Sequence, residues 1–383
     1  MKVLFVAPWV PTPRRPRSFG LLRALTSAHE THAIVVAWSK SEASEALNLP
    51  ASKVTVVRLG RLPAVARVVR ALFGKASLQQ AYVDDPQLRM QIRATLAEFK
   101  PDTAYFNVIR SAHLVNEVAG VPAVLDMDER RSGYYEQLRS RSRQLHRRIL
   151  GAVEAPRMRL AEKAAQEVFQ QILVSSPLDT TTDHNGAVLV RSPHTLGSLR
   201  APDYTNRDVD NIIFVGRMSY GANQEAVAWF VSRVLPGIRK RRPNVVFNIV
   251  GENPPWSIRR LDSSHVKVRG YVDNVSEHYG RASVSIVPVH LATGVQMKLI
   301  ESLFTGTPTV ASRLTAAQAG LADGTECLVA SSPDEWVDQV TELLDHQDLA
   351  RSLGARGQNW AANHYDPALI DQQLLDVITT NSD

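Results

Sequence analysis

The chain has 383 residues, of which 44% are hydrophobic and 21% charged, and this composition excludes an intrinsically disordered protein. The formal net charge is +6 and the pI about 9.5, which favours phosphorylated small molecules or anionic lipids as partners. No zinc-ligand spacing, aromatic RNA-binding motif or DNA-reading helix is found, which argues against nucleic acid. Cys327 is the single cysteine, so an intrachain disulfide is excluded and a cytoplasmic location is expected.

The chain opens on "MKVLFVAPWVP", which predicts a first strand rather than a signal peptide, because prolines interrupt the apolar run. The other apolar runs are too short to cross a bilayer. Further along the first half, short β-branched runs alternate with helical patterns. The predicted strands are 2–8, 32–38, 54–60, 102–107, 122–127 and 170–176, and the predicted helices include 18–28, 86–98 and 136–168.

The alternation starts again in the second half, after a polar stretch at 197–211 that predicts a linker. Nearly continuous apolar strands between helices favour parallel sheets covered on both faces. We therefore predict two open α/β domains, with a ligand cleft between them. The predicted strands are 211–216, 245–251, 266–270, 284–289 and 308–312, and the predicted helices are 223–240, 273–280, 295–305, 333–345 and 347–364.

A lysine and a glutamate, Lys298 and Glu301, share one face of the helix predicted to start near Val295, since residues three apart on a helix are neighbours. Gly294 permits close approach of a ligand, and free amides at 294–296 would form an anion site. Lys298 would add positive charge, and Glu301 could accept hydrogen bonds from ribose hydroxyls. The alternative is a surface ion pair worth roughly 0.3 kcal/mol. Arg217, which follows another strand, favours a nucleotide diphosphate site.

The stretches "FVGRM", "VVFNIVGENPP", "VRGYVDNVSEHYGRASVSIVPV" and "GVQMKLIESLFTGTPTVAS" resemble the retaining glycosyltransferase family 4. The "GxxxKxxE" pattern is most similar to the branch of sugar transferases from bacterial exopolysaccharide gene clusters. The resemblance implies the GT-B fold, in which two Rossmann-like domains face each other across a cleft. It places the acceptor-side domain at 1–196, the nucleotide-sugar domain at 206–365, and a helix at about 366–383 that crosses back to the first domain.

In such a protein, Arg217 would hold the donor diphosphate, with Lys298 replacing a lysine whose position is Ala222 here. Glu301 matches the residue that holds the ribose, and Thr293 replaces a glutamate that contacts the transferred sugar. The segment 270–272 matches the one that faces the nucleobase. The residues implied for donor binding are Gly216, Arg217, Tyr271, Val272, Thr293, Gly294, Val295, Lys298 and Glu301.

The resemblance further implies transfer with retention of anomeric configuration, without a metal or other cofactor, from a UDP- or GDP-linked sugar. Fixed cations would stabilise the charge that develops on the leaving diphosphate. The expected acceptor is a glycan, a lipid-linked sugar or a small-molecule aglycone. Two alternatives remain open: a sugar-nucleotide 2-epimerase of the same fold, and a non-catalytic relative in which Ala222 and Thr293 mark lost activity.

Two loops of the first half are candidates for the acceptor side. The segment 8–20 carries Arg14, Arg15 and Arg17 among prolines, which predicts either a rigid basic loop that meets an anionic acceptor or a solvated loop. The segment 125–135 would bring Asp126, Asp128 and Arg130 to the end of a strand. We assign Arg217, Lys298 and Asp128 as the catalytic candidates.

A run of arginines between residues 134 and 160 accompanies Leu138, Leu145 and Ile149, which form a narrow apolar stripe if the segment is one helix. This pattern is typical of a helix that lies on an anionic membrane, and also of a solvated helix face. The first interpretation predicts peripheral contact with the inner face of the plasma membrane.

Overall fold

The computed structural model describes residues 1–142, 144–181, 186–194, 196, 204 and 207–380. The chain divides into two compact units, and each is described by itself. Unit 1 comprises Met1–Thr195 with Pro367–Asp383, and unit 2 comprises Leu196–Asp366. Most of the stretch predicted to be a linker lies outside the described residues.

Unit 1 contains a seven-stranded sheet in the order β3-β2-β1-β4-β5-β6-β7, and every neighbouring pair is parallel. Its strands are β1 Lys2–Ala7, β2 Glu30–Ala37, β3 Lys53–Arg58, β4 Thr103–Asn107, β5 Ala123–Asp128, β6 Gln171–Val174 and β7 Ala187–Leu189. Its helices are α1 Pro16–Ala28, α2 Lys40–Ala46, α3 Arg61–Ala71, α4 Leu78–Val83, α5 Pro86–Phe99, the 3-10 helix η1 Ile109–Val118, α6 Arg131–Arg141, α7 Leu145–Val168, α8 Pro177–Thr181 and α17 Pro367–Thr380.

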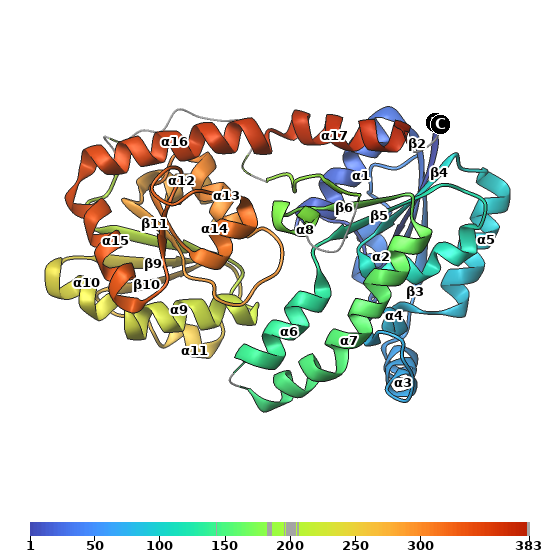
Figure 1. Cartoon of the computed structure of the whole chain (residues 1–383), viewed down its shortest axis with the longest axis horizontal. Coiled ribbons are helices and arrows are strands. Elements are labelled where there is room, and N and C mark those ends of the chain that lie inside the picture. Colours follow the sequence, from blue (N-terminus) through green and yellow to red (C-terminus); the bar gives the residue numbers. More distant parts are fainter. Residues whose placement is uncertain (143, 182–185, 195, 197–203, 205–206, 381–383) are drawn as a thin grey trace. The chain divides into compact units, whose positions relative to one another are not determined.

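Unit 2 contains a six-stranded parallel sheet in the order β10-β9-β8-β11-β12-β13. In Figure 1, helices α9 and α11 lie on one side of this sheet, and α12, α13 and α14 on the other. Its strands are β8 Asn211–Val215, β9 Val246–Val250, β10 Val266–Gly270, β11 Val284–Val287, β12 Thr309–Ser312 and β13 Leu328–Ala330. Its helices are α9 Gly221–Arg233, α10 Leu235–Arg241, α11 Trp256–Arg259, α12 Val275–Arg281, α13 Met297–Phe304, α14 Arg313–Ala319, α15 Pro333–Asp345 and α16 Gln347–Tyr365.

The predicted α/β class is confirmed, and the sheets show why the strands read as continuous apolar runs. The central strands β1, β2 and β4 are buried almost throughout, because helices cover both faces of the parallel sheet. The strands missed from the sequence, β7 and β13, have three residues each, too few to produce a pattern. Helix α17, from the end of the chain, packs against α1 in unit 1. Arg23 Nη2 on α1 lies 3.6 Å from Asp371 Oδ2 on α17.

The prediction of one long helix over 136–168 is wrong. Helix α6 ends at Arg141, α7 begins at Leu145, and the two helices pack against each other. The contact is close at Gly151, where an added Cβ would lie 2.4 Å from the carbonyl oxygen of Tyr135. The three apolar residues proposed as one stripe are therefore divided: Leu138 is buried on α6, whereas Leu145 and Ile149 are exposed on α7.

Each sheet has a point where the strand order reverses direction. In unit 1 it lies between β1 and β4, and in unit 2 between β8 and β11. At such a point, the loops after two adjacent parallel strands run to opposite faces of the sheet and leave a crevice between them. Ligands of open α/β sheets bind in this crevice. Among the described residues, no helix is both long and apolar enough to span a bilayer.

Candidate functional site

The carboxyl edge of β8, β9 and β10 in unit 2 is lined by glycines. Gly216 follows β8, Gly251 follows β9, and Gly270 ends β10. The amide of Gly216 donates to Val250 O at 2.9 Å, and that of Gly251 donates to Gly270 O at 2.8 Å. A Cβ on Gly251 would lie 1.9 Å from Gly216 O, so the backbones pack more closely than any side chain permits. Gly216, Gly251 and Gly270 are half-buried, so this edge is only partly accessible to a ligand.

Lys298 reaches this edge from α13. Its Cε lies 3.1 Å from the place where a Cβ on Gly216 would stand, and its ammonium lies 5.7 Å from the centre of the Phe214 ring. Lys298 Nζ donates to Gln296 Oε1 at 2.9 Å. The stem of Lys298 is thus packed beside Gly216, the residue that precedes Arg217.

The electrostatic environment of Lys298 is unusual for a lysine. Burial lowers the pKa of its ammonium to about 8, and the nearby carboxylate of Glu301 opposes this shift. The same carboxylate also faces Tyr279, whose pKa is raised well above its usual range by burial and then by Glu301. The Tyr279 hydroxyl donates to Lys298 O at 3.1 Å. A bound anion would favour the charged form of Lys298, which the free protein stabilises poorly.

Arg217 lies at the tip of the turn after β8, and its side chain is 53% exposed, with its Nε 3.9 Å from Glu252 Oε1. The turn is held by Asn223, whose Nδ2 donates to Arg217 O at 2.9 Å. Sequence reasoning did not assign this role to Asn223. The sequence offered a signal for this role: Asn223 lies two residues into α9, where a side-chain amide can donate a hydrogen bond to the preceding turn.

The loop between β11 and α13 carries three predicted donor residues, Thr293, Gly294 and Val295. Gly294 has φ +69, a conformation that favours glycine. The hydroxyl of Thr293 is buried and has no hydrogen-bond partner in the described part of the chain. The expected helix start is corrected: α13 begins at Met297, so its first-turn amides start there rather than at 294–296.

The segment after β10 places Tyr271 and Val272 at the same edge of the sheet. Tyr271 is 71% exposed, whereas Val272 packs on a buried cluster that includes Val215 and Val250. Val272 thereby fixes the backbone at this position. Tyr271 remains available to a ligand that lies over β9 and β10.

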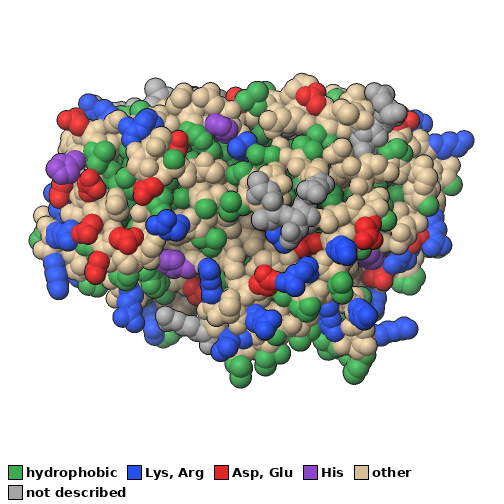
Figure 2. Space-filling view, in the orientation of Figure 1, with side chains coloured by type: hydrophobic (Ala, Val, Ile, Leu, Met, Phe, Trp, Pro, Cys, Tyr) green, Lys and Arg blue, Asp and Glu red, His purple; other side chains and the backbone are tan. Residues whose placement is uncertain are grey.

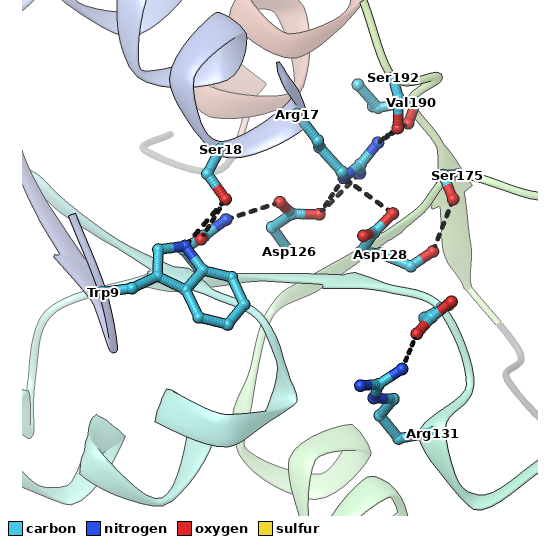
Figure 3. Close-up of polar contacts among 11 residues, drawn as sticks. Trp9, Arg17, Ser18, Asp126, Asp128, Arg131, Ser175, Val190 and Ser192 are labelled. Carbon is cyan, nitrogen blue, oxygen red and sulfur yellow. Dashed lines mark hydrogen bonds and ion pairs between the residues drawn. The ribbon is translucent and has the colours of Figure 1, made fainter. Parts of the chain in front are cut away.

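The acceptor-side candidates of unit 1 are arranged differently, as Figure 3 shows. The Arg17 guanidinium donates to Asp126 Oδ1 through Nε at 2.8 Å and Nη2 at 2.6 Å, and to Val190 O at 2.6 Å. Its Nε lies 3.4 Å from Asp128 Oδ1. Burial opposes the charge on Arg17, but Asp126 and Asp128 outweigh burial and raise its pKa. Burial raises the pKa of Asp126, and Arg17 opposes that shift.

The prediction that Arg17 lies in a basic loop is therefore wrong. Arg17 belongs to the first turn of α1, and both it and Asp126 are buried, so neither is available to an acceptor. Arg15 precedes the helix, where its guanidinium lies 5.1 Å from the centre of the Trp9 ring and donates to Val10 O. Arg14 is exposed, and nothing in the structure assigns it a ligand.

Arg130 lies at the start of α6 and faces carboxylates of the same unit. Burial raises the pKa of Asp179 to about 6, and Arg130 opposes this shift. Burial also raises the pKa of Glu162, which accepts hydrogen bonds from the amide and hydroxyl of Ser132. Arg130 therefore interacts electrostatically with Asp179 and Glu162 of its own unit, and its charge is not available to a ligand alone.

A pocket of about 80 Å³ lies at the strand-order reversal of unit 1. Two of its residues have strained backbones. Val108 has φ +61 and ψ +152, a region occupied almost only by glycine, and Asp128 has φ +64. Such strain costs about 1–3 kcal/mol per residue and concentrates at functional sites. The lining residues are Trp9, Gln79, Val108, Ile109, Arg110, Met127, Asp128, Glu129 and Arg131.

Most of this pocket was missed from the sequence, because its residues come from four segments that lie far apart in the chain. Arg110 donates to Gln79 Oε1 at 3.2 Å and lies 5.4 Å from the centre of the Trp9 ring. Burial, and then the charge of Arg131, lower the pKa of Arg110 to about 10. Arg131 itself pairs with Glu129. The pocket therefore offers both hydrogen-bond donors and acceptors, together with Asp128, whose side chain is 34% exposed.

Residues 209–346, which are 138 of the chain's 383 residues, match the family model described as "Glycosyl transferases group 1". A search of curated proteins gives no match.

Solved structures match over nearly the whole chain. Sucrose-phosphate synthase from Thermosynechococcus elongatus is 15% identical with a TM-score of 0.73, and 99% of each chain is covered. HepE from Anabaena, solved with UDP, is 13% identical with a TM-score of 0.70, over 99% of this chain and 100% of that one. TarM from S. aureus is 9% identical with a TM-score of 0.65, over 98% and 99%. The chain therefore has the GT-B fold of glycosyltransferases.

Proposed function

We propose that this protein is a retaining glycosyltransferase of family 4 that moves a sugar from a nucleotide to an acceptor hydroxyl without a metal ion. The observation that carries the proposal is the placement of Lys298 against Gly216, beside Arg217, at the strand-order reversal of unit 2. The family match covers this region of the chain.

Unit 2 would hold the donor. Arg217 and Lys298 would bind the diphosphate, and Glu301 would accept hydrogen bonds from the ribose. The glycine-lined edge and the backbone at Tyr271 would approach the base. HepE has been solved with UDP and with UDP-glucose, and TarM with UDP, which supports UDP as the nucleotide.

In the proposed reaction the bond from the anomeric carbon to the diphosphate breaks, and the acceptor oxygen bonds to that carbon on the same face. The acceptor proton passes to the departing diphosphate. Negative charge grows on the leaving group, and Arg217 and Lys298 would stabilise it. Each such contact is worth about 2.7–4 kcal/mol in the transition state.

Unit 1 would supply the acceptor site at the pocket that Asp128 lines. A sugar hydroxyl both donates and accepts hydrogen bonds, and the pocket presents Arg110 and Glu129 as well as Asp128. TarM has been solved with α-GlcNAc-glycerol and with fondaparinux. Synthesis of a polysaccharide or glycoconjugate is the proposed setting.

The test is calorimetric titration of UDP, GDP and dTDP into the wild type and Lys298→Ala, without divalent metal. We expect one nucleotide to bind, and its affinity to fall at least tenfold in the variant. Lys240→Ala is the matched control, because it removes the same charge from an exposed position on α10. Equal binding by wild type and Lys298→Ala would refute the phosphate assignment.

A second measurement separates the transferase from the alternatives. Each candidate nucleotide sugar is incubated without acceptor, and the products are identified. A transferase releases free sugar slowly, an epimerase converts the sugar on the nucleotide, and a non-catalytic binding protein leaves it unchanged. Conversion or complete inertness would contradict the proposed reaction.

A further inference from the structure

Helix α3 in unit 1 exposes an apolar stripe to solvent. Leu62 is 85% exposed and Phe73, just past the helix end, is 90% exposed. Between them Val65, Val69 and Leu72 are also exposed. At about 100° per residue these five side chains cover roughly 100° of one face. A stripe of this width normally faces a protein core, and here it faces outward.

The other face of α3 holds the helix in place. Arg67 Nη1 pairs with Asp85 Oδ2 at 2.7 Å, and its Nε and Nη2 donate to Ala81 O and Tyr82 O at 3.3 Å and 3.2 Å. At the helix end, Arg157 Nη2 from α7 donates to Leu72 O at 2.8 Å and to Gly74 O at 3.0 Å. The stripe is therefore exposed on a helix that is anchored at its middle and at its end.

Cations border the stripe. Arg61 and Arg70 fall on its two flanks, and Lys75 follows Phe73; all three are exposed. The sequence from 61 to 83 contains no Asp or Glu. An apolar stripe with basic flanks and no acidic residue is complementary to an anionic surface with an apolar interior.

The start of α7 has the same character. Leu145 and Ile149 are exposed there, next to Arg148, and the sequence from 137 to 153 again contains no Asp or Glu. In Figure 1, α3 and the start of α7 lie toward the same lower side of unit 1. Figure 2 shows hydrophobic side chains beside Lys or Arg side chains along this lower edge.

We propose that α3, with the start of α7, docks unit 1 onto a bilayer that contains anionic lipids. Leu62 and Phe73 enter the interface between headgroups and acyl chains, and Arg61, Arg70 and Lys75 meet the lipid phosphates. The attraction between these basic residues and the anionic lipids is screened by salt. The docking surface is separate from the donor residues of unit 2, so the proposal does not depend on the proposed reaction.

The test is co-sedimentation of the full chain with large vesicles of phosphatidylcholine alone or with 30% phosphatidylglycerol. We expect binding to the anionic vesicles, loss of binding at high salt, and at least a tenfold weaker partition for Leu62→Glu/Phe73→Glu. The matched control is Leu47→Glu/Met90→Glu, which adds the same two carboxylates at other exposed apolar positions of unit 1, at the end of α2 and on α5.

Three results would overturn the proposal. The wild type could stay in the supernatant, or bind both kinds of vesicle equally, or the α3 variant could bind as well as the wild type. Analytical ultracentrifugation without lipid tests whether a second copy of the chain covers the stripe instead. A dimer that Leu62→Glu/Phe73→Glu dissociates, combined with no vesicle binding by the wild type, would assign the stripe to that contact. Circular dichroism and nucleotide titration of the variant show whether it is folded.

Discussion

The carboxyl edges of the two sheets have the same topology and use their charges differently. In unit 1, Arg17 is buried against Asp126 and Asp128, and the three charges largely satisfy one another. In unit 2, Arg217 is more than half exposed and Lys298 is packed beside glycine with a lowered pKa. Breaking a buried ion pair such as that of Arg17 is costly to the fold, whereas an exposed arginine and a lysine with a lowered pKa at a glycine-lined edge are suited to binding an anion.

The largest effect should come from breaking the buried pair in unit 1. Arg17→Met leaves Asp126 buried without its main partner, and we expect a loss of about 3–5 kcal/mol in the free energy of unfolding, measured by urea denaturation. Arg17→Met/Asp126→Leu should recover most of this loss. A single variant as stable as the wild type would show that the ion pair has no structural role.

In unit 2, Arg217→Ala should affect catalysis and leave stability almost unchanged, because the side chain is exposed. We expect kcat/KM to fall by about 10²–10³, the cost of removing one preorganised charge from a transition state. The measurement is steady-state transfer or donor hydrolysis, with a urea curve beside it. If the free energy of unfolding fell as well, Arg217 would support the fold, as Arg17 does, and the loss of activity would not assign it to catalysis.

The contact between Gly216 and Lys298 can be tested directly. In Gly216→Ala, the new methyl group would lie 2.8 Å from Asn223 Nδ2 and 3.1 Å from Lys298 Cε, so both side chains must move. We expect weaker nucleotide binding and a loss of about 1–3 kcal/mol in stability, as in other overpacked sites. Gly280→Ala is the control, because its Cβ would meet nothing within 4 Å. Unchanged nucleotide affinity in Gly216→Ala would show that the position of Lys298 does not affect nucleotide binding.

The smallest effect concerns pH. Lys298 loses its proton near pH 8 in the free protein, and a bound diphosphate would raise its pKa, so nucleotide affinity should be full below pH 8 and decline above it. One proton limits the decline to tenfold per pH unit. Calorimetry between pH 7 and 10 measures this, and Lys298→Met should remove it. An equal decline in Lys298→Met would assign the titration to another group.

The same folded-state pKa has a consequence for stability. Because folding lowers the pKa of Lys298 from 10.5 to about 8, the unfolded chain binds more protons between these values, and stability should rise with pH over that interval. Lys298→Met should remove this contribution and be no less stable than the wild type at pH 7. The comparison needs no ligand, so it is independent of the proposed function.

Local pattern was enough to predict both parallel sheets, because apolar strands between helices have few other solutions. It also placed Lys298 and Glu301 on one helix face, since spacing alone decides which residues on a helix are neighbours. Helix α3 and the short strands β7 and β13 were not predicted. The apolar residues of α3 have helical spacing, but spacing alone does not show whether an apolar face packs against a core or is exposed to solvent.

The sequence by itself determined the α/β class, the place of most strands along the chain and the types of side chain available at each strand end. Only the tertiary structure decided how those types are used. Arg17 and Asp126 are 109 residues apart in the chain, and a buried ion pair between them leaves no local signal. The contact of Lys298 with Gly216 likewise depends on the pairing of β8 with β11, because side chains from distant segments meet only where the sheet brings their strand ends together.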